Sequence, residues 1–480
     1  MSQRSCSLEF KAVDPDDVLE IIKHLKNSKS SGLDELDTYT VKLVASDIVP
    51  SITHIINLSI GDASFPKSWK RSKVVPLLKK GDTHDPNNYR PVALFPILSK
   101  VLERAIFLQL IRYLDENSIL HPNHHGSRKG HSTATALIQM YDSWVTAVDN
   151  GEMAGVMMID LSAAFNMVDH SILLKKLKLM GLENNATKWM ESYLNGRSQC
   201  VCVDGCLSST LPISCGVPQG SALGPLLYIL FTNDLPDAIH SNHEQPISYK
   251  QPSMQCGPCG SLVNYVDGGT YTFTNKDPNM LSTVLTNKYK VIEEYMVGNK
   301  LVINADKTHL IVMGSKKHED ARQTVQLIAG QHRILPSESE KLLGCNINQN
   351  LKWKTHIQSG ESSLLRQLTS RLNALQKVSV HASFKTRLSA ANGVFMSVLS
   401  YLIPVWGGCE GYLVRAMQVL QNRAARQVTK LNWFTPTRKL LNQCNWLSIS
   451  QLIFYCIQNH KIQDSTLPQS ASDNSAPLPY

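Results

Sequence analysis

Two aspartates that lie far apart in the sequence each stand where the residue pattern predicts that a strand ends. The unbroken apolar run at residues 156–159 leads into Asp160, which is typical of a buried strand. Residues 265–268 (YVDG) lie between two predicted strands, and we expect Asp267 and Gly268 to form the turn of that hairpin. The two aspartates can meet only if both strands belong to one sheet. This requirement constrains the fold more than any other feature of the chain.

Carboxylates from distant segments that converge at strand ends suit one kind of chemistry in particular. Mg²⁺ takes hard oxygen ligands and is usually held by one or two protein carboxylates together with water and phosphate. Two such ions stabilise both the attacking and the leaving oxygen in a phosphoryl displacement. The alternative for each aspartate is a helix cap or a turn, which is the commoner role at a strand end.

Composition bounds the class of protein. The chain has 480 residues, of which 42% are hydrophobic and 18% charged, so it is long enough for several packed subdomains. A net charge of +9 permits a nucleic-acid partner without requiring one. The sequence has no apolar run that could span a bilayer, and its eleven cysteines form no regular disulfide framework. We expect an intracellular protein, in the nucleus or cytoplasm, with no membrane association.

Local patterns predict the main elements. Val18, Ile21, Ile22 and Leu25 form the apolar stripe of a first helix, residues 74–78 a strand and residues 98–114 a helix. Residues 199–203 with the following Asp-Gly pair predict a hairpin. Beyond about residue 355 the pattern is helical, and residues 464–480 are polar enough to predict disorder. Cys256 and Cys259 lack a second Cys/His pair at zinc spacing, so we interpret them as loop thiols rather than a zinc site.

An ordered series of motifs resembles the reverse transcriptases of non-LTR (LINE-like) retrotransposons, especially the jockey-like group. The resemblance is densest between residues 67 and 315 and extends, more thinly, over most of the chain. Its motifs are residues 69–70 (WK), 79–82 (KKGD), 88–91 (NYRP), 125–130 (HGSRKG), 160–165 (DLSAAF), 216–221 (GVPQGS), 223–225 (LGP), 304–308 (NADKT) and 342–344 (LLG).

The resemblance implies an α+β fold of the right-hand polymerase type, with fingers, an antiparallel palm sheet and a helical thumb. We expect residues 1–66 to be a leader, 67–318 the fingers and palm, 319–463 a helical thumb region and 464–480 a disordered tail. In the thumb, Arg415, Arg423, Arg426 and Lys430 are suited to a phosphate backbone.

The resemblance also assigns roles to individual residues. Asp160, Asp267 and Lys307 correspond to catalytic residues, and the two aspartates to ligands of a two-ion Mg²⁺ site. The nucleotide-binding residues are Lys79, Arg90, Phe165, Gln219 and Gly220. Lys79 and Arg90 suit a triphosphate by charge, although a solvated loop is the alternative, and Phe165 is either a sugar-excluding aromatic or a core residue. The implied partners are an RNA template, a DNA primer and deoxynucleoside triphosphates.

Three residues depart from the family pattern. Gly268 replaces the second aspartate of the hairpin, Asn166 stands where many relatives carry aspartate, and Ser127 stands where an aromatic is common. The loss at Gly268 removes one metal ligand. The sequence therefore predicts an RNA-directed DNA polymerase domain with impaired activity, and the alternative is a catalytically dead nucleic-acid-binding relic.

Overall fold

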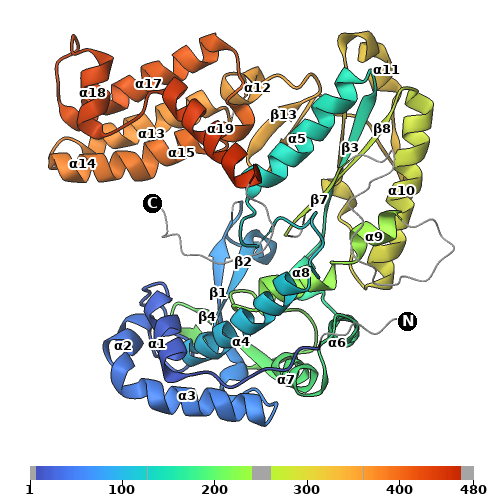
Figure 1. Cartoon of the computed structure of the whole chain (residues 1–480), viewed down its shortest axis with the longest axis vertical. Coiled ribbons are helices and arrows are strands. Elements are labelled where there is room, and N and C mark those ends of the chain that lie inside the picture. The colour runs from blue at the N-terminus through green and yellow to red at the C-terminus, as the bar shows by residue number, and fades with distance from the viewer. Residues whose placement is uncertain are drawn as a thin grey trace.

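The computed structural model describes residues 7–79, 81–126, 128–240, 261–266, 268–360 and 362–465, with side chains as far as residue 459. Figure 1 shows these residues in three groups: a lower lobe built from the first part of the chain, a central sheet with its covering helices, and an upper helical group formed by the last part. None of the described helices combines the length and the apolar character that a membrane crossing requires.

The central sheet carries the end of the strand that leads to Asp160. Its order is β7 (Leu262–Tyr265), β8 (Gly268–Asn275), β3 (Met153–Asp160) and β9 (His309–Met313), and all neighbouring strands are antiparallel. Both faces of β3 are buried, because odd-numbered residues such as Met157 pack in one hydrophobic cluster and even-numbered residues such as Val156 in another. Burial on both faces explains why the strand reads as an unbroken apolar run.

Two long helices cover the two faces of this sheet (Figure 1). On one face, α10 (Pro278–Gly298) packs so closely that a β-carbon on Gly155 would lie 2.8 Å from Leu285. On the other face, α5 (Thr133–Asp149) begins with a capping box at Ser132, and its Trp144 Nε1 donates a hydrogen bond to Thr272 Oγ1 at 2.9 Å. The sheet is therefore held rigidly, and the ends of its strands are fixed relative to one another.

A second sheet belongs to the lower lobe. Its order is β2 (Tyr89–Leu94), β1 (Arg71–Leu78), β4 (Arg197–Val203) and β5 (Cys206–Leu207), with β6 (Leu211–Ile213) also paired to β4. The β1–β4 pair is parallel, and the other pairs are antiparallel. The helices of this lobe are α1 (Pro15–His24), α2 (Thr38–Leu43), α3 (Ala45–Gly61), α4 (Ile97–Glu116), α6 (His170–Leu179) and α7 (Asn184–Leu194).

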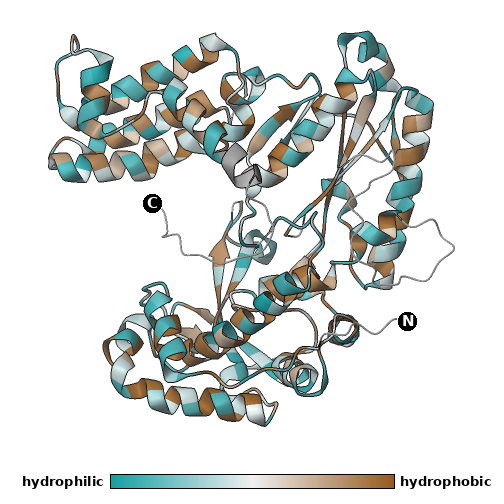
Figure 2. Cartoon of the chain, in the orientation of Figure 1, coloured by the Kyte–Doolittle hydropathy of each residue, from teal (hydrophilic) through white to brown (hydrophobic). Residues whose placement is uncertain are grey.

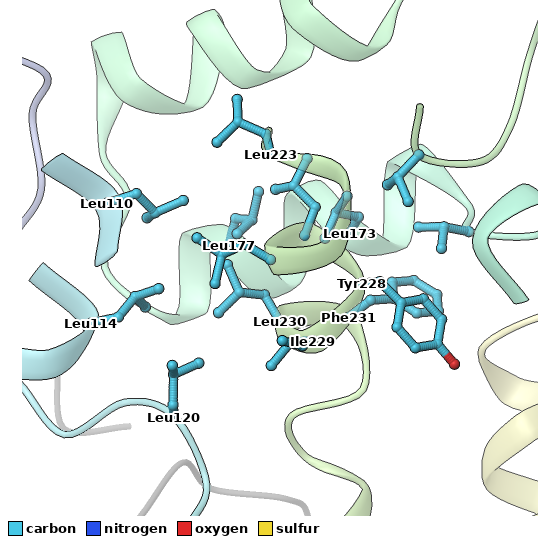
Figure 3. Close-up of a cluster of buried hydrophobic side chains, with 14 of the residues drawn as sticks. Leu110, Leu114, Leu120, Leu173, Leu177, Leu223, Tyr228, Ile229, Leu230 and Phe231 are labelled. Carbon is cyan, nitrogen blue, oxygen red and sulfur yellow. The ribbon is translucent and has the colours of Figure 1, made fainter. Parts of the chain in front are cut away.

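One helix, α8 (Gly224–Phe231), lies inside the hydrophobic core, and every residue in it except Pro225 is buried. Figure 3 shows its side chains Ile229 and Leu230 beside Leu110 and Leu114 of α4 and Leu173 and Leu177 of α6. A helix that is apolar on all sides is expected in such a position. The short α9 (Leu235–His240) follows it. Because α8 is anchored in the core, the loop that precedes it has one fixed end.

The last part of the described chain begins with two hairpins and continues as helices. The hairpins follow α11 (Glu319–Thr324) and pair β10 (Leu327–Ala329) with β11 (His332–Ile334), and β12 (Ser339–Leu342) with β13 (Cys345–Asn348). The helices are α12 (Lys354–Ile357), α13 (Leu364–Val378), α14 (Phe384–Ala391), α15 (Ser397–Ser400), α16 (Ile403–Trp406), α17 (Gly411–Thr429), α18 (Thr437–Cys444) and α19 (Ile449–Ser465). Figure 2 shows hydrophobic and hydrophilic residues interleaved along these helices, as in amphipathic helices that share a core.

Most local predictions are confirmed. The predicted strand at 74–78 lies within β1, the predicted helix at 98–114 within α4, and the hairpin around Asp204 joins β4 to β5. The helical pattern predicted beyond about residue 355 is also confirmed, and in α13 its buried side chains are Leu364, Leu368, Leu372 and Leu375.

Two predictions of detail are wrong. Gly268 belongs to the first position of β8, where it pairs with both Tyr265 and Asp160, so the hairpin connection consists of residues 266 and 267. The helix α19 continues to Ser465, two residues into the segment predicted to be disordered. The rest of that segment, together with Cys256 and Cys259, lies outside the described residues.

Candidate active site

Asp160 is the last residue of β3, and its side chain contacts Lys307, another of the residues to which the resemblance assigns a catalytic role. Lys307 Nζ donates a hydrogen bond to Asp160 Oδ2 at 3.0 Å, although the two residues are 147 positions apart. The Asn304 N–H donates to the Asp160 carbonyl oxygen at 3.0 Å, which attaches the segment before Lys307 to the end of the strand. The Asp160 side chain is 36% exposed and the Lys307 side chain 64%, so both groups remain accessible.

The β7–β8 hairpin lies beside Asp160. Gly268 is its direct cross-strand neighbour, and residues that oppose each other in a sheet share a face. Asp267 lies outside the described residues, so its distance from Asp160 stays a prediction. Its neighbour Val266 has φ of 57°, a left-handed conformation that is unusual for a β-branched residue. The backbone at Val266 is therefore strained and must be held by its surroundings.

The segment at residues 123–126 provides that support. The His125 N–H donates to the Asn264 carbonyl oxygen at 3.0 Å, and the Asn264 N–H donates to the Asn123 carbonyl oxygen at 2.9 Å. A β-carbon on Gly126 would lie 2.7 Å from the Val266 nitrogen, which is closer than real contacts of this kind. Only glycine permits this approach without a shift of the hairpin. The next residue, Ser127, lies outside the described residues.

Four of the five predicted nucleotide-binding residues line one cavity of about 380 Å³: Arg90, Phe165, Gln219 and Gly220. The other lining residues have no role assigned from the sequence, although all except Val92 lie in the motifs quoted above: Pro91, Val92, Pro218, Pro225 and Val266. Because Val266 is part of the hairpin connection, the cavity reaches the tip beside Asp160. The four residues come from β2, the segment after β3 and the loop before α8, and so converge only in the folded chain.

The fifth predicted residue, Lys79, is exposed and does not line this cavity. Its backbone N–H donates to the Asn88 carbonyl oxygen at 2.8 Å, at the end of the β1–β2 hairpin where the connecting loop begins. Leu77 pairs with Arg90 across the same hairpin. Lys79 therefore lies on the same face as Arg90, one step further from the cavity.

The loop at residues 216–223 is fastened to the segment that carries Phe165. The Val217 N–H donates to the Phe165 carbonyl oxygen at 2.8 Å, and Gln219 Nε2 lies 3.5 Å from Asn166 Oδ1. Gly220 has φ of 92°, and a β-carbon there would lie 2.9 Å from the Ala93 carbonyl oxygen. The Phe165 ring stacks on Tyr228 of α8 at 4.8 Å between ring centres, which fixes one wall of the cavity.

A second cavity, of about 370 Å³, opens on the side of Asp160 and Lys307. The β12–β13 turn contributes Leu342 and Leu343 to its lining, and both belong to the motif at residues 342–344. Leu343 and Gly344 adopt positive φ values of 47° and 83° at that turn. Tyr401 from the helical group donates its hydroxyl hydrogen to the Leu343 carbonyl oxygen at 2.8 Å. The carboxylate thus faces a space bounded by the sheet and by this hairpin.

The donor set around Asp160 suits a hard divalent ion only in part. Its carboxylate is a partly exposed oxygen donor of the kind that Mg²⁺ prefers. Across the described ranges, no three His, Cys, Asp or Glu side chains come together as a metal site, and the second expected ligand, Asp267, is outside those ranges. Gly268 contributes no oxygen from a side chain. Asp160 is therefore the carboxylate that the described end of β3 offers to such an ion.

The predicted basic residues of the helical region differ in their environments. Arg415, Arg423 and Lys430 are exposed. Arg426 is half-buried; its guanidinium lies 4.6 Å from the centre of the Trp433 ring, and its Nη2 donates to the Trp433 carbonyl oxygen at 3.0 Å. Residues 364–459 carry eleven lysines and arginines and a single acidic residue, Glu410, a net charge of +10. This region therefore accounts for the positive charge of the whole chain.

A functionally placed residue that the sequence analysis missed is Glu103, whose side chain is completely buried in α4. Ser99, Glu103, Ile106 and Leu110 recur at helical spacing and are all buried, so Glu103 stands in an apolar stripe. A single carboxylate in an apolar stripe could have identified Glu103 from the sequence, because a buried charge requires hydrogen-bond or charged partners.

Comparison with known proteins gives a consistent result. The family described as reverse transcriptase (RNA-dependent DNA polymerase) matches residues 77–347. The chain is 26% identical over 432 residues to the probable RNA-directed DNA polymerase from transposon X-element of Drosophila melanogaster, a match that covers 88% of this chain and 44% of that protein. It is 25% identical over 435 residues to the RNA-directed DNA polymerase from mobile element jockey of the same species, covering 90% and 46% of the two chains. The chain spans about half the length of these relatives.

Proposed function

Because the chain belongs to the reverse transcriptase family of non-LTR retrotransposons, we propose that it is the RNA-directed DNA polymerase portion of such an element. One observation carries the proposal. The cavity lined by Arg90, Phe165, Gln219 and Gly220 reaches the hairpin tip beside the Asp160–Lys307 pair. A nucleotide-sized space next to an accessible carboxylate and an ammonium is what nucleotide addition needs.

In this proposal the lower-lobe sheet and its hairpin act as fingers, the central antiparallel sheet as the palm and the helices beyond α12 as the thumb. Residues 67–318 then contain the fingers and palm, residues 319–463 the thumb region, and residues 1–66 the leader. The concentration of positive charge between residues 364 and 459 supports a thumb that holds a primer–template duplex through its phosphates. An RNA template, a DNA primer and deoxynucleoside triphosphates are the substrates.

The residues around the cavity suggest a division of labour. Arg90, with Lys79 beside it, neutralises the triphosphate, and the bidentate guanidinium also orients it. Phe165, which is stacked on Tyr228 and cannot easily move, excludes a ribose 2′-hydroxyl. Gln219 and Gly220 position the nucleotide. Lys307 stabilises the charge that develops on the leaving pyrophosphate, or donates a proton to it.

Reverse transcriptases generally use divalent metal ions, and we assign Mg²⁺ to Asp160 and Asp267. When bound, the ions supply activation of the primer hydroxyl and stabilisation of the leaving oxygen. Asp160 and Asp267 would bind and orient these ions. Because residue 268 is glycine, the site has one carboxylate fewer than the family pattern. We infer that the natural chain is impaired in catalysis.

The second candidate function is binding without catalysis. Gly268 favours it, because the positive helical region and the nucleotide cavity do not depend on the missing carboxylate. In that case the chain holds nucleic acid as a relic of the polymerase.

Extension of a labelled DNA primer on an RNA template separates the two candidates. The purified chain is compared with an Asp160→Asn variant, which keeps the shape of the side chain but removes its charge. Extension that requires Asp160 supports the polymerase. Tight primer–template binding with no extension by either protein, even after Gly268→Asp, favours the relic.

A further inference from the structure

The buried carboxylate of Glu103 links α4 to a loop more than a hundred residues away. Its Oε1 accepts a hydrogen bond from Ser99 Oγ at 2.9 Å within the same helix. Its Oε2 accepts a hydrogen bond from the Ala222 N–H at 2.8 Å. The two oxygens therefore have separate partners, and only one of them reaches the loop. A buried carboxylate that accepts from a backbone N–H makes a stronger bond than a neutral acceptor would.

Arg197 supplies a positive charge near this carboxylate. It is only 3% exposed, and its Nε donates to the Tyr193 carbonyl oxygen at 2.7 Å. Its guanidinium lies 4.2 Å from the centre of the Tyr193 ring and 5.3 Å from that of Phe65. Burial raises the pKa of Glu103, and the charge of Arg197 is the largest of the effects that oppose this rise. Within the described part of the chain, Nη1 and Nη2 of Arg197 have no hydrogen-bond partner.

The loop held by Glu103 is the one that carries Gln219 and Gly220. Two hydrogen bonds within the loop hold its turn together. Ser221 Oγ donates to the Pro218 carbonyl oxygen at 2.7 Å and accepts from the Gly224 N–H at 2.9 Å. The bond from Ala222 to Glu103 ties the same turn to α4. The loop is thereby fixed between α8 and α4, and Gln219 projects from its other side into the nucleotide cavity.

We propose that Glu103 is a positioning residue for nucleotide binding, whose buried carboxylate holds the loop at residues 218–223 so that Gln219 and Gly220 keep their places in the cavity. The inference rests on the proposed function of that cavity. Glu103 touches no substrate, since it lies behind the loop. Arg197 has a supporting role, because it keeps a charged acceptor tolerable in the core.

Two variants remove the carboxylate in different ways. Glu103→Gln keeps the shape and can keep both contacts, because its amide nitrogen can donate to Ser99 Oγ while its oxygen accepts from the Ala222 N–H, but the acceptor is then neutral and the bond to the loop is weaker. Removing the charge alone also leaves Arg197 without a counter-charge, which can destabilise the chain. The double variant Glu103→Leu with Arg197→Met removes both charges together, a replacement that proteins often tolerate. Ser99→Ala is the matched control, because it deletes the other bond to the same carboxylate and leaves the bond to Ala222 intact.

The experiment measures the full chain in two ways. Hydrogen exchange of the amides at residues 218–224 reports the loop directly and needs no activity. Steady-state extension in a Gly268→Asp background, together with nucleotide binding to the primer–template complex of the natural chain, reports the function. For both Glu103 variants we expect faster exchange at Ala222 and a nucleotide KM raised about tenfold, the effect of losing one charge-assisted hydrogen bond. Affinity for the primer–template should be unchanged, and Ser99→Ala should shift KM by less than about twofold.

A double-mutant cycle tests whether Glu103 acts through Gln219. After Gln219→Ala, the Glu103→Gln change should raise KM by less than about twofold more, because the group that it positions is gone. Unchanged exchange at Ala222 in both Glu103 variants would overturn the inference. So would faster exchange over the whole chain with a matching fall in kcat and duplex affinity, since that is a general loss of stability. Absence of nucleotide binding by every protein would instead overturn the proposed function, and the exchange measurement would still decide whether Glu103 positions the loop.

Discussion

Replacing Gly268 by aspartate should restore polymerase activity by at least about a hundredfold, and the local geometry allows the change. A β-carbon on Gly268 would meet nothing closer than the Tyr265 carbonyl oxygen at 3.7 Å, and the residue does not have a positive φ. It opposes Asp160 directly, so the two β-carbons should lie about 4.5–5.5 Å apart. The new carboxylate therefore enters on the side of the sheet where Asp160 already lies.

The expected magnitude follows from what the carboxylate does. An ion held by too few ligands is misplaced, and a misplacement of about 1 Å can cost about a hundredfold in rate. Without Mg²⁺ the added charge should repel Asp160, partly offset by Lys307, which already contacts that carboxylate at 3.0 Å. When Mg²⁺ is present, both carboxylates attract the cation, and its binding relieves their repulsion. The Gly268→Asp chain should therefore gain more thermal stability from Mg²⁺ than the natural chain does.

Single-turnover extension of a labelled primer on an RNA template measures the rate, and thermal unfolding with and without Mg²⁺ measures the binding. Gly268→Asn is the matched control for shape without charge, and Gly268→Ala the control for backbone stiffness. In the Gly268→Asp background, Asp267→Ala and Asp160→Ala should each abolish extension. If the natural chain extends primers as fast as the Gly268→Asp chain, the second aspartate is dispensable and the reasoning fails. If Gly268→Asn is as active as Gly268→Asp, charge is not the cause.

Three further outcomes are expected. Binding of a primer–template duplex should weaken steeply as the salt concentration rises. In the double variant Arg415→Ala with Arg423→Ala, the slope of log K against log salt concentration should be shallower by about one per lost phosphate contact. Equal slopes for the natural chain and the variant would contradict this. Gly126→Ala, whose β-carbon would press on Val266, should slow extension by about tenfold or more with little loss of duplex affinity, as gel-shift and extension assays on one preparation can establish. Burial lowers the pKa of His124 to about 3, so in the unfolded chain this histidine takes up a proton at a higher pH than in the folded chain, and stability falls as the pH drops below about 6.5. At about pH 5 the part of the loss that comes from His124 is about 2 kcal/mol, so His124→Gln should make this part of the urea-denaturation profile shallower.

Four of the five residues to which the resemblance assigns nucleotide binding line one cavity, because the folded chain brings their separate motifs together, and their binding role stays a prediction. Arg90, Phe165 and Gln219 each follow or precede a recognisable strand or glycine-rich turn, and the cavity gathers all three. Lys79 was predicted from the same kind of signal, but it lies one step beyond the cavity, because its position depends on the length of the β1–β2 hairpin.

Features that depend on pairing between distant segments could not be obtained in this way. The hairpin connection was predicted one residue too late, because Gly268 is kept in a strand by pairing with Asp160, which lies far away in the sequence. The role of Glu103 depends on Ala222, 119 residues further along, and no local pattern encodes that partner. Arg426 was grouped with free phosphate-binding cations, whereas Trp433 engages its guanidinium.

The position of Gly268 in a strand also bears on what kind of defect the natural chain should have. A glycine at a turn could relax the hairpin, but this one is paired on both sides, and Val266 is braced by Gly126. The Asp160–Lys307 contact and the nucleotide cavity are formed without a side chain at residue 268. The missing carboxylate should therefore lower the rate of chemistry without unfolding the site. It follows that nucleotide and duplex binding should survive in the natural chain, and that a single substitution should separate binding from catalysis.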